Sequence, residues 1–193
     1  MEYLESYNFL ISNLTLVGHI FIAVTLIGFV FRKCIKNIWK TYVDNNLFVT
    51  LFFSLSAFLG SLFYSVVIGF QPCSLCYWQR IFMYPMLFLS ALSLIKKDKL
   101  DPSYLLMFSG IGSLISIYHI YIQFTPNTLP CSTTGQGVSC SENWVLEYGY
   151  ITIPVMALTC FLNIFLVNLF NKVEKNKSNN NNLIWKFFPR SLI

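Results

Sequence analysis

The amino-acid sequence predicts an all-α membrane protein, on the basis of its composition, its apolar stretches and the placement of its positive charges. The chain has 193 residues, of which 55% are hydrophobic and only 11% are charged. Soluble domains carry about 25% charged residues, so about half of the expected charge is missing. The net charge of +5 lies in short runs beside apolar segments and not on one folded face, which argues against nucleic-acid binding.

Five apolar stretches are each long enough to cross a bilayer as a helix: 9–31, 47–70, 76–95, 103–124 and 151–170. A span needs roughly 20 helical residues to cross about 30 Å of hydrocarbon. The first stretch has acidic residues before it and basic residues after it, and it is longer than the apolar core of a signal peptide. It is therefore expected to be a retained N-terminal transmembrane helix.

The third stretch can cross the membrane only if its helix begins near Cys76. From Ile81 to Lys96 it would measure only about 22 Å. Starting at Cys76 adds a turn and places aromatic side chains at the membrane interface, where such residues concentrate. Cys76 and Arg80 are thus predicted to lie at the mouth of a span.

Positive charges indicate the orientation. All basic residues except Arg80 follow the first, third or fifth stretch, namely Arg32, Lys33, Lys36, Lys40, Lys96, Lys97, Lys99, Lys172, Lys175, Lys177, Lys186 and Arg190. The positive-inside rule assigns these segments to the cytoplasm. The N-terminus, segment 71–75 and loop 125–150 are then outside, and the C-terminus is cytoplasmic. The polar tail 172–193 is expected to be cytoplasmic and disordered.

Cys73 and Cys76 form a Cys-x-x-Cys pair at the outer mouth of the third span. This spacing commonly gives a reversible disulfide, and the first turn of a helix favours a thiolate through its unpaired amides and its dipole. Cys76 is therefore the predicted thiolate and the donor to an electron acceptor. The alternatives are an ordinary structural disulfide or half of a zinc site.

Two ionisable residues inside the membrane are further candidates, because charged or titratable groups at that depth usually have a function. Arg80 lies one helical turn after Cys76 and is predicted to stabilise its thiolate or to hydrogen-bond a carbonyl group of a bound acceptor. The alternative for Arg80 is an arginine that reaches the lipid headgroups. His119 lies in the outer half of the fourth span, although a lone histidine is more often a packed residue.

The second pair, Cys131 and Cys140, is separated by small residues that include two glycines. Such a loop closes to the Cα separation of roughly 5.5–6 Å that a disulfide requires, and an exposed disulfide is readily attacked by a thiolate. A permanent staple of the loop is the alternative. Cys34 is expected to stay reduced in the cytoplasm, and Cys160 is expected to be a packing residue in the last span.

The run from Pro72 to Arg80, PCSLCYWQR, followed by an outer loop with two cysteines, resembles the disulfide bond formation protein B (DsbB) family, and most closely its short, BdbC-type members. The resemblance covers about 50–170. It implies a four-helix transmembrane bundle in the bacterial cytoplasmic membrane. The expected organisation is an extra N-terminal transmembrane helix with a basic loop over 1–46, the bundle over 47–171, and the tail.

The resemblance also implies an activity, in which a secreted, thioredoxin-fold, DsbA-like thiol oxidase is reoxidised and its electrons pass to a membrane quinone, ubiquinone or menaquinone. By this likeness the disulfides are Cys73–Cys76 and Cys131–Cys140. Cys131 would form the mixed disulfide with the partner, and Cys140 would attack Cys73. Cys76 would face the quinone with Arg80 beside it.

The stretch from His119 to Gln123 resembles the family's spacing before the second pair, which makes His119 a candidate for the quinone site. Two features depart from the family. The best-known members have a longer segment with an amphipathic helix between the second pair, and helix 9–31 lies outside the usual four.

Two competing functions remain open from the sequence. A transmembrane conduit that delivers reductant outward would need paired cysteines inside opposed spans, whereas Cys160 is unpaired there. A non-enzymatic membrane protein could use the four outer cysteines as structural disulfides or as ligands of zinc. No metal is expected in the favoured reading.

Overall fold

The computed structural model describes residues 2–97, 100–125, 140–141 and 144–187, with side chains described between 5 and 177. Within those ranges the chain forms α-helices, one short π-helical segment and no strand. The elements are α1 (Glu2–Val30), α2 (Lys36–Asp44), α3 (Asn46–Leu62), η1 (Phe63–Val67), α4 (Ser74–Lys96), α5 (Pro102–Phe124) and α6 (Ile153–Phe187). The all-α prediction is confirmed.

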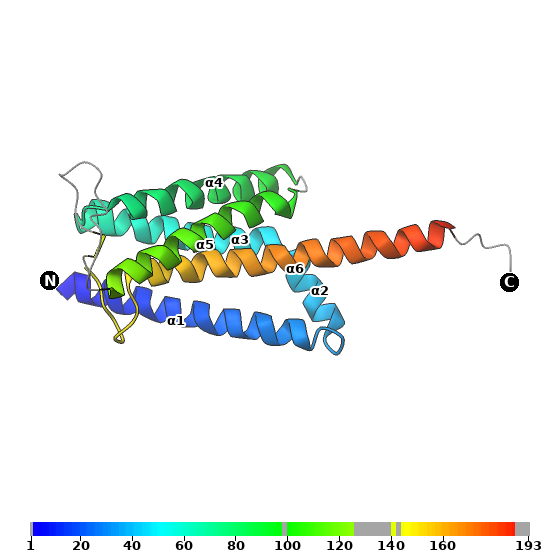
Figure 1. The fold of residues 1–193 in the computed structure, drawn as a ribbon, viewed down its shortest axis with the longest axis horizontal. Coiled ribbons are helices and arrows are strands. Elements are labelled where there is room, and N and C mark those ends of the chain that lie inside the picture. Colours follow the sequence, from blue (N-terminus) through cyan, green and yellow to red (C-terminus); the bar gives the residue numbers. More distant parts are fainter. Residues whose placement is uncertain (1, 98–99, 126–139, 142–143, 188–193) are drawn as a thin grey trace.

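Five helical segments are long and apolar enough to cross a membrane: Glu5–Val30, Asn46–Val67, Ser74–Lys96, Pro102–Phe124 and Ile153–Lys177. Each overlaps one of the stretches predicted from the sequence. Figure 1 shows these helices running side by side, with the short α2 lying across one end of the group. The prediction of a helical bundle with an extra N-terminal span is confirmed.

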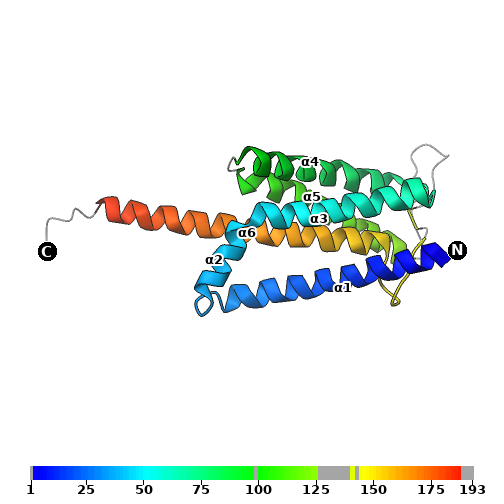
Figure 2. The same ribbon diagram turned by 180° about the vertical axis from the view of Figure 1, so that it is seen from behind.

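Helices α3, α4, α5 and α6 form the bundle, in which α6 packs along α5 and α3, and α4 packs on α3 and α5. Helix α1 packs on α6 at the outside of this group (Figures 1 and 2). The bundle core is built from Phe53, Met86, Leu105 and Phe161, all of them buried. Gly112 makes room for this core, because a Cβ atom there would overlap the Phe161 ring.

The start of α4 fixes the position of the first cysteine pair. Cys73 is the N-cap residue, with an extended backbone at φ −71° and ψ 170°, and the helix begins at Ser74, close to the predicted start at Cys76. The start of α5 is fixed by a side-chain cap: the Asp101 carboxylate accepts a hydrogen bond of 2.9 Å from the Ser103 amide. Pro102 occupies the first turn of α5, where its missing N–H is not needed.

Buried asparagines on α6 hold neighbouring elements together inside the apolar bundle. Asn168 donates to Thr50 Oγ1 at 3.0 Å and accepts from Asn46 Nδ2 at 2.7 Å, which links α6 to α3. Asn171 donates to the Val43 carbonyl at 2.7 Å, which links α6 to α2. Polar groups in hydrocarbon need such internal partners because no water is available to them.

Two segments differ from the sequence prediction. Residues 36–44 form the amphipathic helix α2, whereas only a basic loop was expected, because Trp39 and Val43 pack against Phe170 while the lysines face away. Beyond 172, where a disordered tail was predicted, α6 continues to Phe187. No glycine or proline interrupts this polar stretch until Pro189, so nothing in the sequence stops the helix earlier.

The two ends of the bundle differ in what they carry. The start of α1, the segment between η1 and α4, and the start of α6 lie at one end, whereas α2 and the C-terminal end of α6 lie at the other (Figures 1 and 2). The reactive groups described next all lie at the N-terminal end.

Candidate thiol redox site

Two cysteines and a histidine from distant parts of the chain meet at this end. Cys73 caps α4, His119 lies near the end of α5, and Cys140 lies in the segment before α6. All three are buried, and their sulfur or ring nitrogen atoms lie within 4.8 Å of one another. Cys73 of the first predicted pair and Cys140 of the second therefore lie close together. We call Cys73, Cys76, His119 and Cys140 the thiol site.

The described cysteines of the site differ in their bonding. Cys73 and Cys76 are free thiols whose sulfur atoms lie 3.3 Å apart, while Cys140 is disulfide-bonded. Cys131, the predicted partner of Cys140, lies outside the described residues. The described part of the site thus combines a reduced Cys-x-x-Cys pair with an oxidised sulfur next to it.

Stabilising contacts converge on Cys73. The hydrogen bond between the Cys73 and Cys76 sulfur atoms lowers the pKa of Cys73 below the ordinary thiol value, burial opposes this effect, and His119 lowers the pKa further. The position of Cys73 at the N-terminus of α4 favours the same charge. The sequence analysis assigned the stabilised thiolate to Cys76, whereas these contacts support a thiolate at Cys73.

Gln79 orients the histidine and was not singled out from the sequence. Its side-chain amide lies 3.4 Å from His119 Nδ1, and His119 Nε2 lies 3.6 Å from Cys73 Sγ. Because the amide N–H donates to Nδ1, the ring carries its proton on Nε2, facing the sulfur. Gln79 is buried within the apolar span. A polar residue three positions after Cys76, inside the motif, was the signal available in the sequence.

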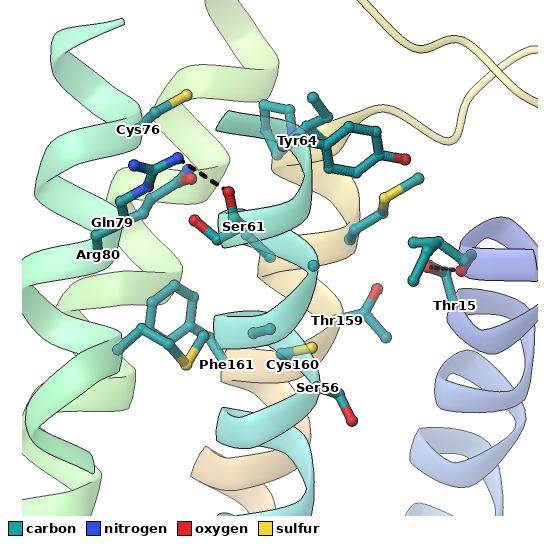
Figure 3. A pocket seen from close by; sticks show the side chains of 18 of the residues that line it. Thr15, Ser56, Ser61, Tyr64, Cys76, Gln79, Arg80, Thr159, Cys160 and Phe161 are labelled. Atoms are coloured by element: carbon teal, nitrogen blue, oxygen red, sulfur yellow. Dashed lines mark hydrogen bonds between the residues drawn. The ribbon is translucent and has the colours of Figure 1, made fainter. Parts of the chain in front are cut away.

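Arg80 links α4 to α3. Its guanidinium donates to the Ser61 carbonyl at 3.3 Å and lies 5.7 Å from the centroid of the Tyr77 ring. Figure 3 shows Arg80 and Cys76 on the same helix, with Arg80 reaching toward Ser61. A guanidinium has five N–H donors, so a further acceptor can be bound from the same position.

A cavity of about 460 Å³ opens beside these groups. Its wall includes the four members of the thiol site together with Arg80, and residues of α1, α3 and α6, most of them apolar, supply most of the remainder. This volume and this mixture of many apolar and few polar groups are typical of small-molecule sites. The site therefore brings a reactive thiol pair, a cation and an apolar chamber together.

The other described cysteines, Cys34 and Cys160, lie outside the thiol site. Cys34 is exposed in the turn after α1 and Cys160 lies in α6; both are free thiols. The sulfur and ring nitrogen atoms of Cys73, His119 and Cys140 lie close enough together to hold a metal ion. Zinc, however, is bound by thiolate, and the sulfur of Cys140 is engaged in a disulfide.

The fold and the site define a class: a multi-pass helical membrane protein with a thiol–disulfide site at one end of its bundle. Within that class the chain belongs to the family described as "Disulfide bond formation protein DsbB", which matches residues 44–171. Helix α1 and most of α2 precede the matched residues.

Curated relatives agree with this assignment. The chain is 35% identical over 144 residues to the SPbeta prophage-derived disulfide bond formation protein B of Bacillus subtilis, covering 75% of the chain and 97% of the relative. It is 36% identical over 124 residues to the disulfide bond formation protein C of the same organism, covering 64% of the chain and 90% of the relative. A probable disulfide formation protein C of Halalkalibacterium halodurans is 35% identical over 133 residues, covering 69% and 97%. No solved structure was found that matches the chain.

Proposed function

We propose that the protein is a quinone-linked thiol:disulfide oxidoreductase that reoxidises a secreted, thioredoxin-fold, DsbA-like thiol oxidase. The observation that carries the proposal is the approach of Cys73 Sγ and Cys140 Sγ to within 4.8 Å. Sulfur atoms of two pairs at this distance need only a small movement for one to attack the other. Membership of a family named for disulfide bond formation supports the same activity.

Electrons arrive from the partner in the first exchange. A partner thiolate attacks Cys131 of the Cys131–Cys140 disulfide, so that a partner–Cys131 disulfide forms and Cys140 leaves as a thiolate. Cys140 then attacks Cys73 of the oxidised first pair. The Cys140–Cys73 bond forms, the Cys73–Cys76 bond breaks, and Cys76 leaves as a thiolate.

The second half of the cycle resolves the partner–Cys131 disulfide and the Cys140–Cys73 disulfide. The second thiolate of the partner attacks the partner sulfur that is bonded to Cys131. This forms the disulfide of the partner and releases Cys131 as a thiolate. Cys131 attacks Cys140, restores the Cys131–Cys140 disulfide and releases Cys73. A leaving thiol departs faster when its pKa is low, so the contacts that lower the pKa of Cys73 favour this last step. Two electrons now reside on Cys73 and Cys76.

The cavity residues fit a quinone as the acceptor. Cys76 and Arg80 share the cavity wall, Arg80 can donate to a carbonyl oxygen, and the apolar lining suits a lipophilic molecule. A bound quinone supplies two-electron, two-proton acceptor chemistry. The chain's own contribution is to hold the thiol pair beside that chamber and to favour the thiolate form of Cys73 through its contacts with Cys76 and His119.

The orientation follows from charge. The end that carries the thiol site is placed outside the cytoplasm, and the end with α2 and the lysines after α4 is placed inside, by the positive-inside rule. The protein would then sit in the bacterial cytoplasmic membrane with its N-terminus outside and its C-terminus in the cytoplasm. The partner oxidase and the thiol site share the outer side.

Anaerobic stopped-flow with purified protein, reduced thioredoxin-fold partner and either ubiquinone or menaquinone tests the proposal. The wild-type protein should reduce quinone as the partner is oxidised. The Cys76→Ser variant should still trap the partner through Cys131 while quinone reduction is lost. Cys34→Ser, at the opposite end, is the control and should keep the wild-type rate. Normal quinone reduction by Cys76→Ser would contradict the proposal.

A further inference from the structure

Helix α1 lies outside the residues matched by the family, yet it is fixed firmly to the bundle. The Gly18 carbonyl accepts a hydrogen bond of 3.2 Å from Asn163, and His19 Nε2 lies 3.0 Å from Thr159 Oγ1. A Cβ atom at Gly18 would come within 2.7 Å of Thr159 Cγ2, so the absence of a side chain permits this approach. Helix α1 is therefore held in a defined position against α6.

Helix α1 meets the neighbouring α3–η1 segment at two levels. Near one end Tyr7 stacks on Phe63 with ring centroids 3.5 Å apart, and further along Phe21 packs on Phe53 with centroids 5.6 Å apart. Between these levels α1 contributes one wall of the cavity, through Ile11, Leu14, Thr15, Val17, Gly18 and Phe21.

The facing residues explain why space remains between the two contact levels. The lining residues of α3 in this stretch include Ser56, Ala57 and Gly60, which have small side chains or none. Figure 3 shows α1 with Thr15 standing apart from α3, and Thr159 of α6 between them. The result is a chamber with walls on α1, α3 and α6.

This chamber is continuous with the thiol site, because Cys76 and Arg80 line the same cavity. Along α3 the lining extends from Ser61, which Arg80 contacts, to Phe48, and this stretch of helix is about 20 Å long. The cavity thus has a polar, reactive end and a long apolar extension. That shape fits a ring beside the thiols and an apolar chain running away from them.

We propose that α1 is the wall that holds and selects the prenyl chain of the acceptor. The inference rests on the proposed function, since the occupant is the quinone that accepts electrons from Cys73 and Cys76. Contact with α1 replaces lipid around more of the prenyl chain and gives the prenyl chain a defined path. Chain length, and not only the ring, then determines how well an acceptor is used.

A pair of substitutions on α1 tests the inference. Leu14→Trp puts a large ring into the chamber, whereas Ile20→Trp puts the same ring on an α1 residue that is 63% exposed and does not line it. The measurement is the apparent KM for two quinones with the same ring and with a long or a short prenyl chain. Leu14→Trp should raise the long-to-short ratio of KM about tenfold. Ile20→Trp should leave that ratio at the wild-type value. An unchanged ratio in Leu14→Trp would overturn the inference, while wild-type protein that reduces neither quinone would overturn the proposed function instead.

A second readout does not depend on turnover. The full-length wild-type protein in lipid nanodiscs is irradiated with a prenylquinone whose chain carries a photoreactive group at its far end, and labelled peptides are identified by mass spectrometry. Label should appear within residues 11–21 and should fall in Leu14→Trp but not in Ile20→Trp. Absence of label from this segment would overturn the inference. Equal labelling by a phospholipid with the same group, undiminished by excess prenylquinone, would show a lipid site and overturn it too.

Discussion

Cys73 is the residue on which the two cysteine pairs and the histidine converge. It lies 3.3 Å from Cys76, 3.6 Å from His119 and within 4.8 Å of Cys140, sulfur to sulfur or sulfur to nitrogen. In the proposed cycle Cys140 attacks Cys73, and Cys73 later leaves when Cys131 attacks Cys140. A stabilised thiolate makes Cys73 a better leaving group. Its neighbours supply that stabilisation.

The pH dependence of Cys73 reactivity should report these contacts. Thiolates react with iodoacetamide and thiols do not, so with the first pair reduced the alkylation rate of Cys73 rises with pH and levels off above its pKa. Because the pKa is lowered, the midpoint should lie below that of an ordinary thiol, about 8.5. Cys76→Ala removes the main hydrogen bond and should shift the midpoint to higher pH.

The control for this experiment is Cys34→Ser, which changes an exposed thiol outside the site. Its midpoint should equal that of the wild-type protein, measured on the Cys73 peptide by mass spectrometry. His119→Phe should shift the midpoint upward as well, because the histidine is a weaker contributor in the same direction. A midpoint that is the same in wild type and Cys76→Ala would show that the pair does not set the reactivity.

At the scale of helices, the bundle depends on close approach between α5 and α6. Gly112 faces the Phe161 ring with no room for a Cβ atom, whereas a Cβ at Gly110 would lie 3.6 Å from the Phe165 ring, an ordinary contact. Thermal unfolding in detergent should therefore show Gly112→Ala destabilised by about 1–3 kcal/mol, as for other overpacked cores. Gly110→Ala should unfold near the wild-type temperature, and equal midpoints for the two variants would contradict this account of the packing.

Hydropathy predicted the five long helices because a span needs only a sufficiently long apolar stretch. The same criterion cannot detect α2, in which lysines alternate with the two residues that pack on Phe170. It also placed the end of α6 where polar residues begin, although helix formation there needs no apolar face. These differences lie in segments at or beyond those ends of the predicted spans that carry the basic residues.

The candidate site was only partly accessible to sequence reasoning. The Cys-x-x-Cys spacing and Arg80 are local signals that a short window reveals. The contact of Cys73 with His119 and Cys140 depends on how α4, α5 and the segment before α6 meet in space. No local pattern carries that information, and for the same reason the contact of Gln79 with His119 and the place of α1 in the cavity wall were unknown.

At the scale of the whole molecule, redox groups lie at one end of the bundle and the basic connections at the other. An introduced cysteine at an exposed position tests the proposed orientation, because a bulky impermeant reagent reaches it more readily than the buried Cys73 and Cys140. Leu146→Cys, at a residue that is 53% exposed near the thiol site end, should react with an impermeant maleimide in intact cells after reduction. Cys34 should react only once the membrane is permeabilised, and labelling in the reverse order would invert the topology.

The most direct test of the central claim, that the two pairs exchange electrons through Cys73 and Cys140, uses a variant that retains only these two cysteines of the site. Cys76→Ser/Cys131→Ser should form a Cys73–Cys140 disulfide under mild oxidation, detected as a linked peptide by mass spectrometry. Cys73→Ser/Cys131→Ser, which leaves Cys76 instead, should form its linked peptide more slowly. Failure of the Cys73–Cys140 bond to form in folded protein would contradict the account.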